Sequence, residues 1–158
     1  MNTGNSNSGG WESSNMRTAI CGTSLSSYSG TIIAVIPAAL RAVLKSVTKY
    51  TNNTGNSSAA SAVTATTDYF FLLSEYEVFG STTYANSNEA SKQAQYSYYS
   101  AGNSKVKYNH SATSTAVIWW LRSPRAGISA YFVRVNTGGT VSSSSAGYSC
   151  GFAPGFCV

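Results

Sequence analysis

Residues 119–158 read WWLRSPRAGISAYFVRVNTGGTVSSSSAGYSCGFAPGFCV, and this stretch decides the fold. Its aromatic and β-branched residues, with the apolar residues just before it, predict strands at 116–123, 130–136, 139–145 and 152–158. The Thr-Gly-Gly sequence at 137–139 supplies the positive-φ positions that a tight turn requires, so the second and third of these strands should form a hairpin. The chain is therefore expected to end in strands punctuated by turns.

The two ends of this stretch are tightly specified, whereas its middle is not. Trp119 and Trp120 are adjacent, so on a strand they point to opposite faces, and we expect one to anchor the core and the other to cover a flanking loop. Arg122 lies in an apolar setting and would need carboxylate or carbonyl partners there, which indicates a structural role. In the middle, residues 125–129 and 147–150 vary in size and polarity without pattern, and four serines in a row occupy predicted strand positions. Local stability does not select these residues.

The first two-thirds of the chain predict two helices among loops and strands. Pro37 and the spacing of the apolar residues predict a short amphipathic helix over 36–47 that runs into a strand at 46–51. A polar loop follows at 51–61, and a buried strand is predicted at 69–73. Ser74, with Glu77 three residues later, matches a capping box. A second helix is predicted over 88–102, ending at Gly102, and a short strand at 104–109.

Helices followed by strands predict an α+β fold, with two helices and antiparallel sheets, in a single domain. The 158 residues are enough for one domain with a sizeable core. Residues 1–10 are polar and rich in glycine, so we expect a flexible leader there and the ordered domain over 11–158, beginning at Trp11.

The charges are few and scattered. Ten basic and five acidic residues give a net charge of +5, and the basic residues form no run longer than Lys105-Val-Lys107. A nucleic-acid-binding protein concentrates its cations on one face or arm, so this distribution speaks against nucleic acid as a partner. No apolar run is long enough to span a bilayer, and no secretion signal is visible, so we expect no membrane insertion.

The residues that could carry catalysis or hold a metal give little support to either. His110 is the only histidine, in a loop with no nucleophile set beside it. Glu75 and Glu77 are interpreted as a helix cap and part of an internal network rather than as an acid/base pair. Five acidic residues are few for a calcium site. We therefore expect no enzymatic activity, no cofactor and no metal.

The cysteine pattern does not indicate a set of disulfide bonds. Cys21, Cys150 and Cys157 are odd in number and lack the spacing of a metal site, so we expect free thiols.

Several motifs, in order along the chain, resemble one family. The segments FLLSEYEVFG (71–80), YSYYSAGNSKVKY (96–108), WWLRSP (119–124) and GFAPGFCV (151–158) are similar to the variable proteins of diversity-generating retroelements, in the branch common in gut Firmicutes and their phages. WESSNMR (11–17) and LKSVTKYT (44–51) resemble the same branch, so the likeness covers nearly all of residues 11–158. Phe152 departs from the pattern, because the family more often has Val, Leu or Ile there, and we expect a slightly different core contact.

The resemblance implies a C-type-lectin fold of the formylglycine-generating-enzyme type, with a variable region at about residues 119–158. In such systems a reverse transcriptase copies a template repeat with errors at adenines, and the cDNA replaces the end of the gene. Asn codons then become codons for many residues, but never for Lys, Glu, Gln, Met or Trp. Residues 125–150 contain none of these five.

Matching this chain to the family pattern implies sixteen diversified, ligand-binding positions, with Phe132, Val135, Ala146 and Ser149 as framework between them. The positions are Arg125, Ala126, Gly127, Ile128, Ala130, Tyr131, Arg134, Asn136, Thr140, Ser142, Ser143, Ser144, Ser145, Gly147, Tyr148 and Cys150. Arg125, Tyr131, Arg134 and Tyr148 are the expected anchors, because aromatic and arginine side chains dominate binding hot spots.

The function implied is a non-enzymatic, hypervariable receptor-recognition domain on a phage virion or bacterial surface. Its partner would be a protein or glycan ligand on a cell surface, and a larger parent protein could bring several copies together. A glycan-binding lectin of fixed specificity and a structural or decoration module of a virion remain open as alternatives. An oxidase of the formylglycine type would need a pair of active-site thiols, and Cys150 lies where variation is expected.

Overall fold

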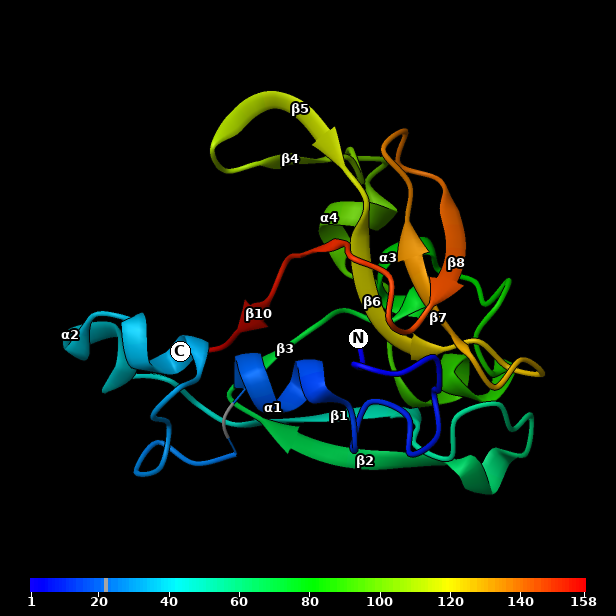
Figure 1. Ribbon diagram of the computed structural model, residues 1–158, viewed down its shortest axis with the longest axis horizontal. Helices are drawn as coiled ribbons and strands as arrows, with labels where there is room; N and C mark the ends of the chain where they lie inside the picture. The colour runs from blue at the N-terminus through cyan, green and yellow to red at the C-terminus, as the bar shows by residue number, and fades with distance from the viewer. Residues whose placement is uncertain (22) are drawn as a thin grey trace.

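A four-stranded sheet, in the order β8-β7-β6-β9, forms the centre of the molecule (Figure 1). The computed structural model describes residues 1–21 and 23–158, apart from the Cys21 side chain. β6 (Trp119–Pro124) pairs antiparallel with β7 (Tyr131–Val135), and β7 pairs antiparallel with β8 (Val141–Ser145). β9 (Gly151–Phe152) runs parallel to β6. The predicted hairpin at 135–141 is confirmed, although only Gly139 of its two glycines has a positive φ, +81°.

This sheet has a core on each face, because the side chains of β6 and β7 are apolar on both sides. Trp120 and Phe132 pack on one face together with Trp11 and other buried residues. Trp119 and Val133 pack on the other. The two tryptophans therefore point to opposite faces, as predicted, but each is only 1% exposed. The expectation that only one of them anchors the core is wrong, because both do, whereas Trp119 also contacts a flanking loop, since its Nε1 donates to the Lys105 carbonyl at 3.0 Å.

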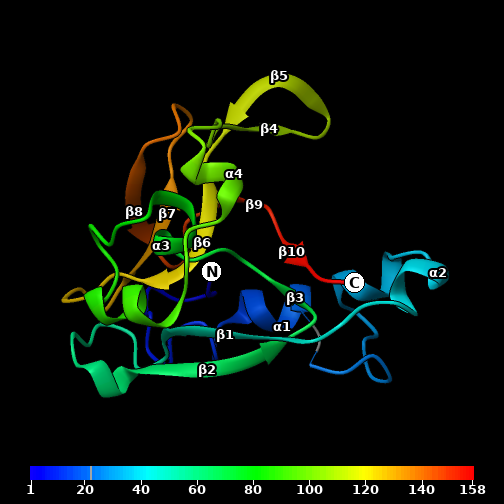
Figure 2. The ribbon, with the colours of Figure 1, turned by 180° about the vertical axis from the view of Figure 1, so that it is seen from behind.

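Three two-stranded sheets surround the central one (Figures 1 and 2). β1 (Val47–Asn52) pairs with β2 (Val63–Asp68), β3 (Phe70–Phe71) with β10 (Gly155–Phe156), and β4 (Lys107–Asn109) with β5 (Ala112–Val117), all antiparallel. The strands expected near 46–51 and 104–109 are confirmed. The buried strand expected at 69–73 is only two residues long, and the one expected at 152–158 is split between β9 and β10.

The helices are short. The α-helices are α1 (Asn15–Cys21), α2 (Ala38–Arg41), α3 (Glu75–Phe79) and α4 (Ser97–Ser100), and the 3-10 helices are η1 (Ile32–Val35), η2 (Ala60–Ala62) and η3 (Ser87–Lys92). The helix expected over 36–47 keeps Pro37 at its start but has only four residues. Among the described residues, no helix is long and apolar enough to cross a membrane.

The single helix predicted over 88–102 is wrong, because tertiary contacts interrupt it. Gln93 is extended, and its side-chain oxygen accepts a hydrogen bond from Arg122. The Tyr96 N–H donates to the Glu77 carbonyl instead of to a preceding turn. Only η3 and α4 form within the predicted range. The helical segment ends at Gly102, with φ +80°, as predicted.

The capping box predicted at α3 is confirmed. The Ser74 hydroxyl accepts from the Glu77 N–H at 3.1 Å, and the Glu77 carboxylate accepts from the Ser74 N–H at 2.8 Å. The reciprocal bonds satisfy two backbone donors that a helix start leaves unpaired. A local motif therefore fixes the element that carries Glu75 and Glu77.

Residues 1–10 are not a flexible leader, and this prediction is corrected. Met1 is buried in the core with Trp11, and Asn7 is 1% exposed. The Asn2 N–H donates to the Ala146 carbonyl at 3.0 Å, which fastens the segment beside the end of β8. Composition suggested mobility, but the segment finds hydrogen-bond partners more than a hundred residues away. The result is one α+β domain with few helices and several antiparallel sheets.

Candidate ligand-binding site

The sixteen candidate positions all lie outside the core. Each is exposed or partly exposed, whereas the four buried residues of the 125–150 segment are Phe132, Val133, Val135 and Ala146. None of those four is a candidate, and three of them are positions expected as framework. Ser149, the fourth expected framework position, is exposed, so burial gives no reason to expect a constant residue there. Apart from Cys150, which packs against one core, side chains at the candidate positions can thus change without opening a cavity.

The strand register distributes these positions over both faces of the β7–β8 hairpin. Arg134 pairs with Ser142, so both lie on the face of Trp120 and Phe132. Tyr131 pairs with Ser145 and lies on the opposite face, with Val133 and Val135. Because β8 is the last strand of the sheet, the two faces meet at its outer edge. The structure therefore does not gather the sixteen positions on one flat surface.

Arg134 organises the first face. Its Nε donates to the Ser144 hydroxyl at 2.6 Å, and Nη1 donates to the Asn136 side-chain oxygen. Cys150 packs against the core on the same side, and burial raises the pKa of its thiol to about 11, with the nearby Arg134 charge opposing the rise. The thiol is therefore protonated at neutral pH and a poor nucleophile.

Arg125 organises the second face. Its Nη1 donates to the Ser143 hydroxyl at 2.8 Å, and its guanidinium lies 4.7 Å from the centre of the Tyr84 ring. The loop that carries Tyr84 is fixed by Glu75, whose carboxylate accepts from the N–H groups of Thr83, Tyr84 and Ala85 at 2.6–3.2 Å. Glu75 therefore supports the site without belonging to it. Burial raises the pKa of Glu75, against these hydrogen bonds.

The loop at 125–130 connects β6 to β7, and Asn7 holds its backbone in place. The Asn7 side-chain nitrogen donates to the carbonyls of Ile128 and Tyr131, each at 2.8 Å, and the Asn7 N–H donates to the Ser129 carbonyl at 2.7 Å. These bonds use only the backbone of the loop. Its side chains can change while its path stays fixed.

A surface pocket of about 480 Å³ lies beside the other candidate segment. Cys150 and Phe152 line it together with Lys107, Tyr108, His110 and Trp119 from the neighbouring strands and their turn. Phe152 is 43% exposed, so the expected core contact is corrected: its side chain lines this pocket. Tyr148 and Cys150 also line an adjoining pocket with Thr137. Lys107 and Tyr108 were not predicted to belong to the site, because only the fold brings the β4–β5 hairpin beside residues 148–152.

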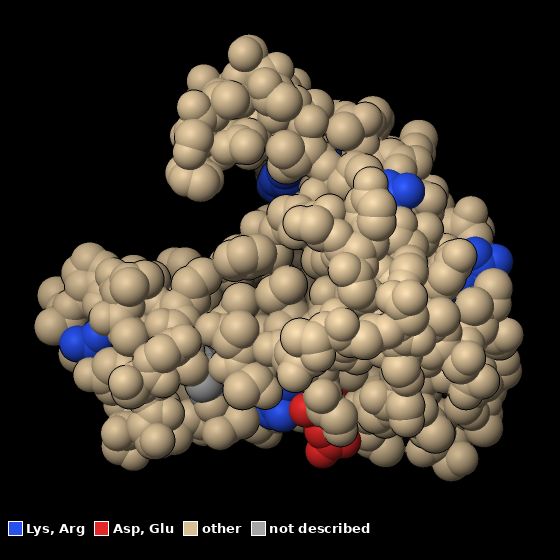
Figure 3. Space-filling model, viewed as in Figure 1, with Lys and Arg blue, Asp and Glu red and all other residues tan. Residues whose placement is uncertain are grey.

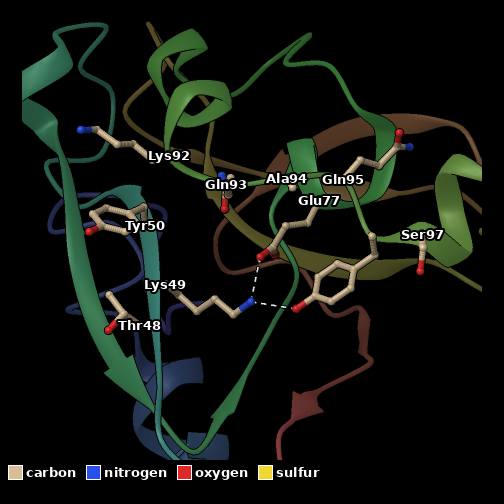
Figure 4. Close-up of a pocket in the computed structure, with 10 residues that line it drawn as sticks. Thr48, Lys49, Tyr50, Glu77, Lys92, Gln93, Ala94, Gln95 and Ser97 are labelled. Atoms are coloured by element: carbon tan, nitrogen blue, oxygen red, sulfur yellow. Dashed lines mark hydrogen bonds and ion pairs between the residues drawn. The ribbon is translucent and has the colours of Figure 1, made fainter.

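A second cleft, of about 400 Å³, contains charged groups but none of the candidate positions (Figure 4). Lys49 Nζ lies 2.9 Å from a Glu77 carboxylate oxygen and 2.8 Å from the Tyr96 hydroxyl. Glu77 also binds the buried Arg122. These two cations hold the pKa of Glu77 at about 2 despite its burial. The structural role expected for Arg122 and Glu77 is confirmed, since each charge is satisfied by the others.

The exposed charge of the molecule is almost entirely positive. Four of the five acidic residues, Asp68, Glu75, Glu77 and Glu89, are buried, and Glu12 is exposed. On the face shown in Figure 3, Lys and Arg atoms lie at several separate places and acidic atoms at one. Neither Arg125 nor Arg134 forms an ion pair within the described part of the chain. The candidate site is therefore polar, weakly cationic and rich in hydroxyl groups.

The described residues bring no three His, Cys, Asp or Glu side chains together as metal ligands. The His110 ring nitrogen lies 2.9 Å from the Ser111 hydroxyl at the exposed β4–β5 turn. Cys150 and Cys157 are free thiols, as expected, whereas the Cys21 side chain lies outside the described residues. What the arrangement offers is a contact surface of hydroxyl, amide, guanidinium and phenol groups.

Comparison with known proteins gives one match. A family model described as "Domain of unknown function (DUF6273)" matches residues 1–158 and so includes the N-terminal segment that packs against β8. No curated protein and no solved structure matches the chain.

Proposed function

The chain belongs to the DUF6273 family, and we propose that it is a non-enzymatic ligand-binding domain whose binding surface is diversified by a retroelement. The ligand would be a protein or glycan on a cell surface. The domain would be displayed on a phage virion or a bacterial surface, and a parent protein could present several copies. The α+β arrangement is compatible with the C-type-lectin fold of the formylglycine-generating-enzyme type that the motifs imply, and we propose that fold as part of the same hypothesis.

The observation that carries the proposal is the separation between the buried positions and the sixteen candidate positions. The sixteen positions assigned from motifs alone contain no buried residue, while the 125–150 segment does contain buried residues, all at other positions. Strand β7 shows this within five residues: Phe132, Val133 and Val135 are buried, and Tyr131 and Arg134 are not. Mutagenesis restricted to the sixteen positions would leave every buried residue of both cores unchanged.

The composition of the surface suits recognition of many ligands. Tyr131 and Tyr148 offer large amphipathic rings with few rotatable bonds, and the serines of β8 offer adaptable hydrogen bonds, as in antibody loops. The backbone that carries them is held by the sheet, by Asn7 and by the Tyr84 carbonyl, which accepts from the Ala126 N–H at 2.9 Å. A rigid scaffold with interchangeable side chains limits the entropy lost on binding.

A pair of display libraries tests the proposal. In the first, the sixteen positions carry the residues that adenine mutagenesis of Asn codons can produce. In the second, sixteen other non-buried positions on β2, β5 and the segment at 53–60 carry the same residues. Each library is measured for the fraction of members that resist protease and for binders recovered against one defined protein, such as egg-white lysozyme.

We expect the first library to keep most members folded and to yield specific binders. The second should also remain largely folded but yield few binders, because its positions do not converge on one hairpin. If the first library unfolds in bulk, or yields no more binders than the second, the assignment of the surface fails.

A further inference from the structure

The outer edge of β8 is an unpaired main-chain surface that runs through the middle of the candidate site. β8 is the last strand of the central sheet and lies at the periphery of the molecule in both ribbon views (Figures 1 and 2). Its five residues, Val141–Ser145, are all partly exposed. A strand in this position presents a row of backbone N–H and C=O groups to whatever approaches.

Two hydrogen bonds establish which groups face outward. The Asn136 N–H donates to the Thr140 carbonyl and the Ala146 N–H donates to the Ala130 carbonyl, both at 2.8 Å. In an antiparallel ladder, hydrogen-bonded pairs alternate with non-hydrogen-bonded pairs. The residues of β8 that bond to β7 are therefore Ser142 and Ser144. The N–H groups of Val141, Ser143 and Ser145 point away from the sheet, as do the carbonyls of Val141 and Ser143.

Between Val141 and Ser144 this edge lacks the features that protect sheet edges from pairing, whereas at its end the Ser145 hydroxyl donates to the side-chain oxygen of Asn5 in the N-terminal segment. The register between β7 and β8 is regular over all five pairs, without a bulge. The strand contains no proline and no charged residue, and four of its side chains are serines. Natural edge strands are blocked by charges, prolines, bulges or covering segments. No hydrogen bond to the outward groups of Val141 and Ser143 is formed within the described residues.

An arginine lies on each side of this edge without a carboxylate partner. Arg134 bonds to Ser144 on one face of the sheet, and Arg125 bonds to Ser143 on the other. Consecutive residues of an added strand point to opposite faces. Two neighbouring acidic residues on that strand would reach the two guanidiniums, one on each face.

We propose that the β8 edge binds an extended, acidic segment of a partner protein as an additional antiparallel strand. This inference rests on the proposed function and specifies the ligand class of the same site. The outward backbone groups of β8 supply hydrogen bonds that do not depend on the diversified side chains. Those side chains, on both faces, supply specificity, and in this variant Arg125 and Arg134 select for acidic residues.

The alternating spacing of donors and acceptors favours a polypeptide over a glycan, because another strand matches it repeat for repeat. A second copy of this chain is disfavoured by charge. Pairing β8 with β8 would bring two guanidiniums from each copy together on a surface with no free carboxylate nearby, and like charges there are repulsive.

The test compares two substitutions at one residue. Ser143→Pro removes an outward N–H and fills its place with the proline ring, and it leaves the bonds of Ser142 and Ser144 to β7 in place. Ser143→Ala also loses the hydroxyl that binds Arg125, but it keeps the N–H. The pair therefore isolates the backbone contribution. Thermal unfolding and circular dichroism of both variants establish that they are folded.

The probe is a fluorescent peptide of sequence Thr-Val-Thr-Glu-Glu-Thr-Val-Thr, with both ends blocked, titrated by anisotropy. We expect a dissociation constant below about 1 mM for the wild-type protein. Ser143→Pro should weaken binding by about tenfold or more, and Ser143→Ala by less than about threefold. The peptide methylated at every backbone nitrogen keeps the charge but cannot pair as a strand, and it should not bind. This second comparison uses the wild-type protein, so it holds even if Ser143→Pro is unstable.

Four results would overturn the inference. These are no peptide binding at about 1 mM, equal binding of the methylated peptide, equal binding by Ser143→Pro, or preference for an oligogalacturonate of the same charge. A wild-type dimer in sedimentation that Ser143→Pro dissociates and Ser143→Ala does not would assign the edge to a second copy instead.

The two proposals fail in different ways. If lysozyme binders from the first library are unaffected by placing proline at position 143 and the peptide does not bind, the diversified surface stands and the edge role is lost. If that library yields no binders while the peptide binds through the edge, the reverse holds.

Discussion

At the scale of single residues, two buried glutamates have pKa values shifted in opposite directions. Burial raises the pKa of Glu89 to about 7, against hydrogen bonds from the Ser123 hydroxyl and the Asn52 N–H. Glu77 is also buried, but Arg122 and Lys49 bring its pKa down to about 2. The charged form is therefore disfavoured at Glu89 and favoured at Glu77. The two residues act on stability in different pH ranges.

The free energy of unfolding should fall as the pH rises from about 4.5 to about 7. In this range the folded protein still holds a proton on Glu89, while the unfolded chain has released it, so stability declines. Glu89→Gln should remove a decline on the order of 1–3 kcal/mol, because the amide stays neutral. Urea unfolding of both proteins at pH 5 and pH 7.5 measures this. An equal fall in the free energy of unfolding between the two pH values in both proteins would contradict it. Glu77 acts at lower pH, where its stabilising contribution is lost as the pH falls from about 4.5 toward 2.

At the scale of elements, the N-terminal segment is the part that positions the loop of the site. Asn7→Ala should lower the free energy of unfolding by about 1–3 kcal/mol, because it leaves partly buried carbonyls of the 125–131 segment without donors. Hydrogen exchange should also speed up at the amides of residues 125–131. Asn103→Ala is the matched control, since its side chain makes a single exposed bond to the Tyr98 carbonyl. A similar loss of stability in both variants would show that Asn7 has no such role.

Elements with local causes were predicted, and elements with distant causes were not. The capping box of Ser74 and Glu77 and the turn at Gly139 depend on neighbours within a few residues, and both formed where expected. The prediction of one helix over 88–102 was wrong because Gln93 bonds to Arg122, which is 29 residues away. The prediction of a flexible leader at residues 1–10 was wrong for the same reason, since the hydrogen-bond partners of Asn7 lie more than a hundred residues away in the sequence. Amino-acid composition gives no information on contacts between residues so far apart in the sequence.

At the scale of the whole molecule, one ionic network joins the central sheet, which carries the site, to the β1–β2 sheet. Arg122 on β6 bonds to Glu77 on α3 and to the backbone and Thr51 hydroxyl of β1, and Lys49 on β1 bonds to Glu77. Its chemistry was predictable, because a buried arginine requires such partners. Its geometry was not, because the three elements meet only in the folded chain.

Arg122→Ala should destabilise the protein by about 3–5 kcal/mol, because Glu77 would lose its closest buried countercharge. Lys92→Ala, at an exposed lysine of η3, should change stability by less than about 0.5 kcal/mol. Thermal and urea unfolding give both values. Similar losses of stability in the two variants would show that Arg122 does not stabilise the fold through this network.

The candidate site was predictable in part. The sixteen positions followed from the resemblance and from a segment whose residues serve no local purpose, and the structure places all of them outside the core. The contributions of Tyr84, Asn7 and the β4–β5 hairpin were missed, because each reaches the site from a distant part of the chain.

The most direct test of diversification is to sequence the native gene and the several kilobases around it. We predict a reverse-transcriptase gene and a near-copy of the segment that encodes residues 119–158. Differences between the two copies should fall at template adenines and within the sixteen positions. Finding neither, with independent isolates all carrying the same residues at 125–131 and 142–150, would contradict the account. The hairpin would then be one fixed surface, as in a lectin of constant specificity or a virion decoration module.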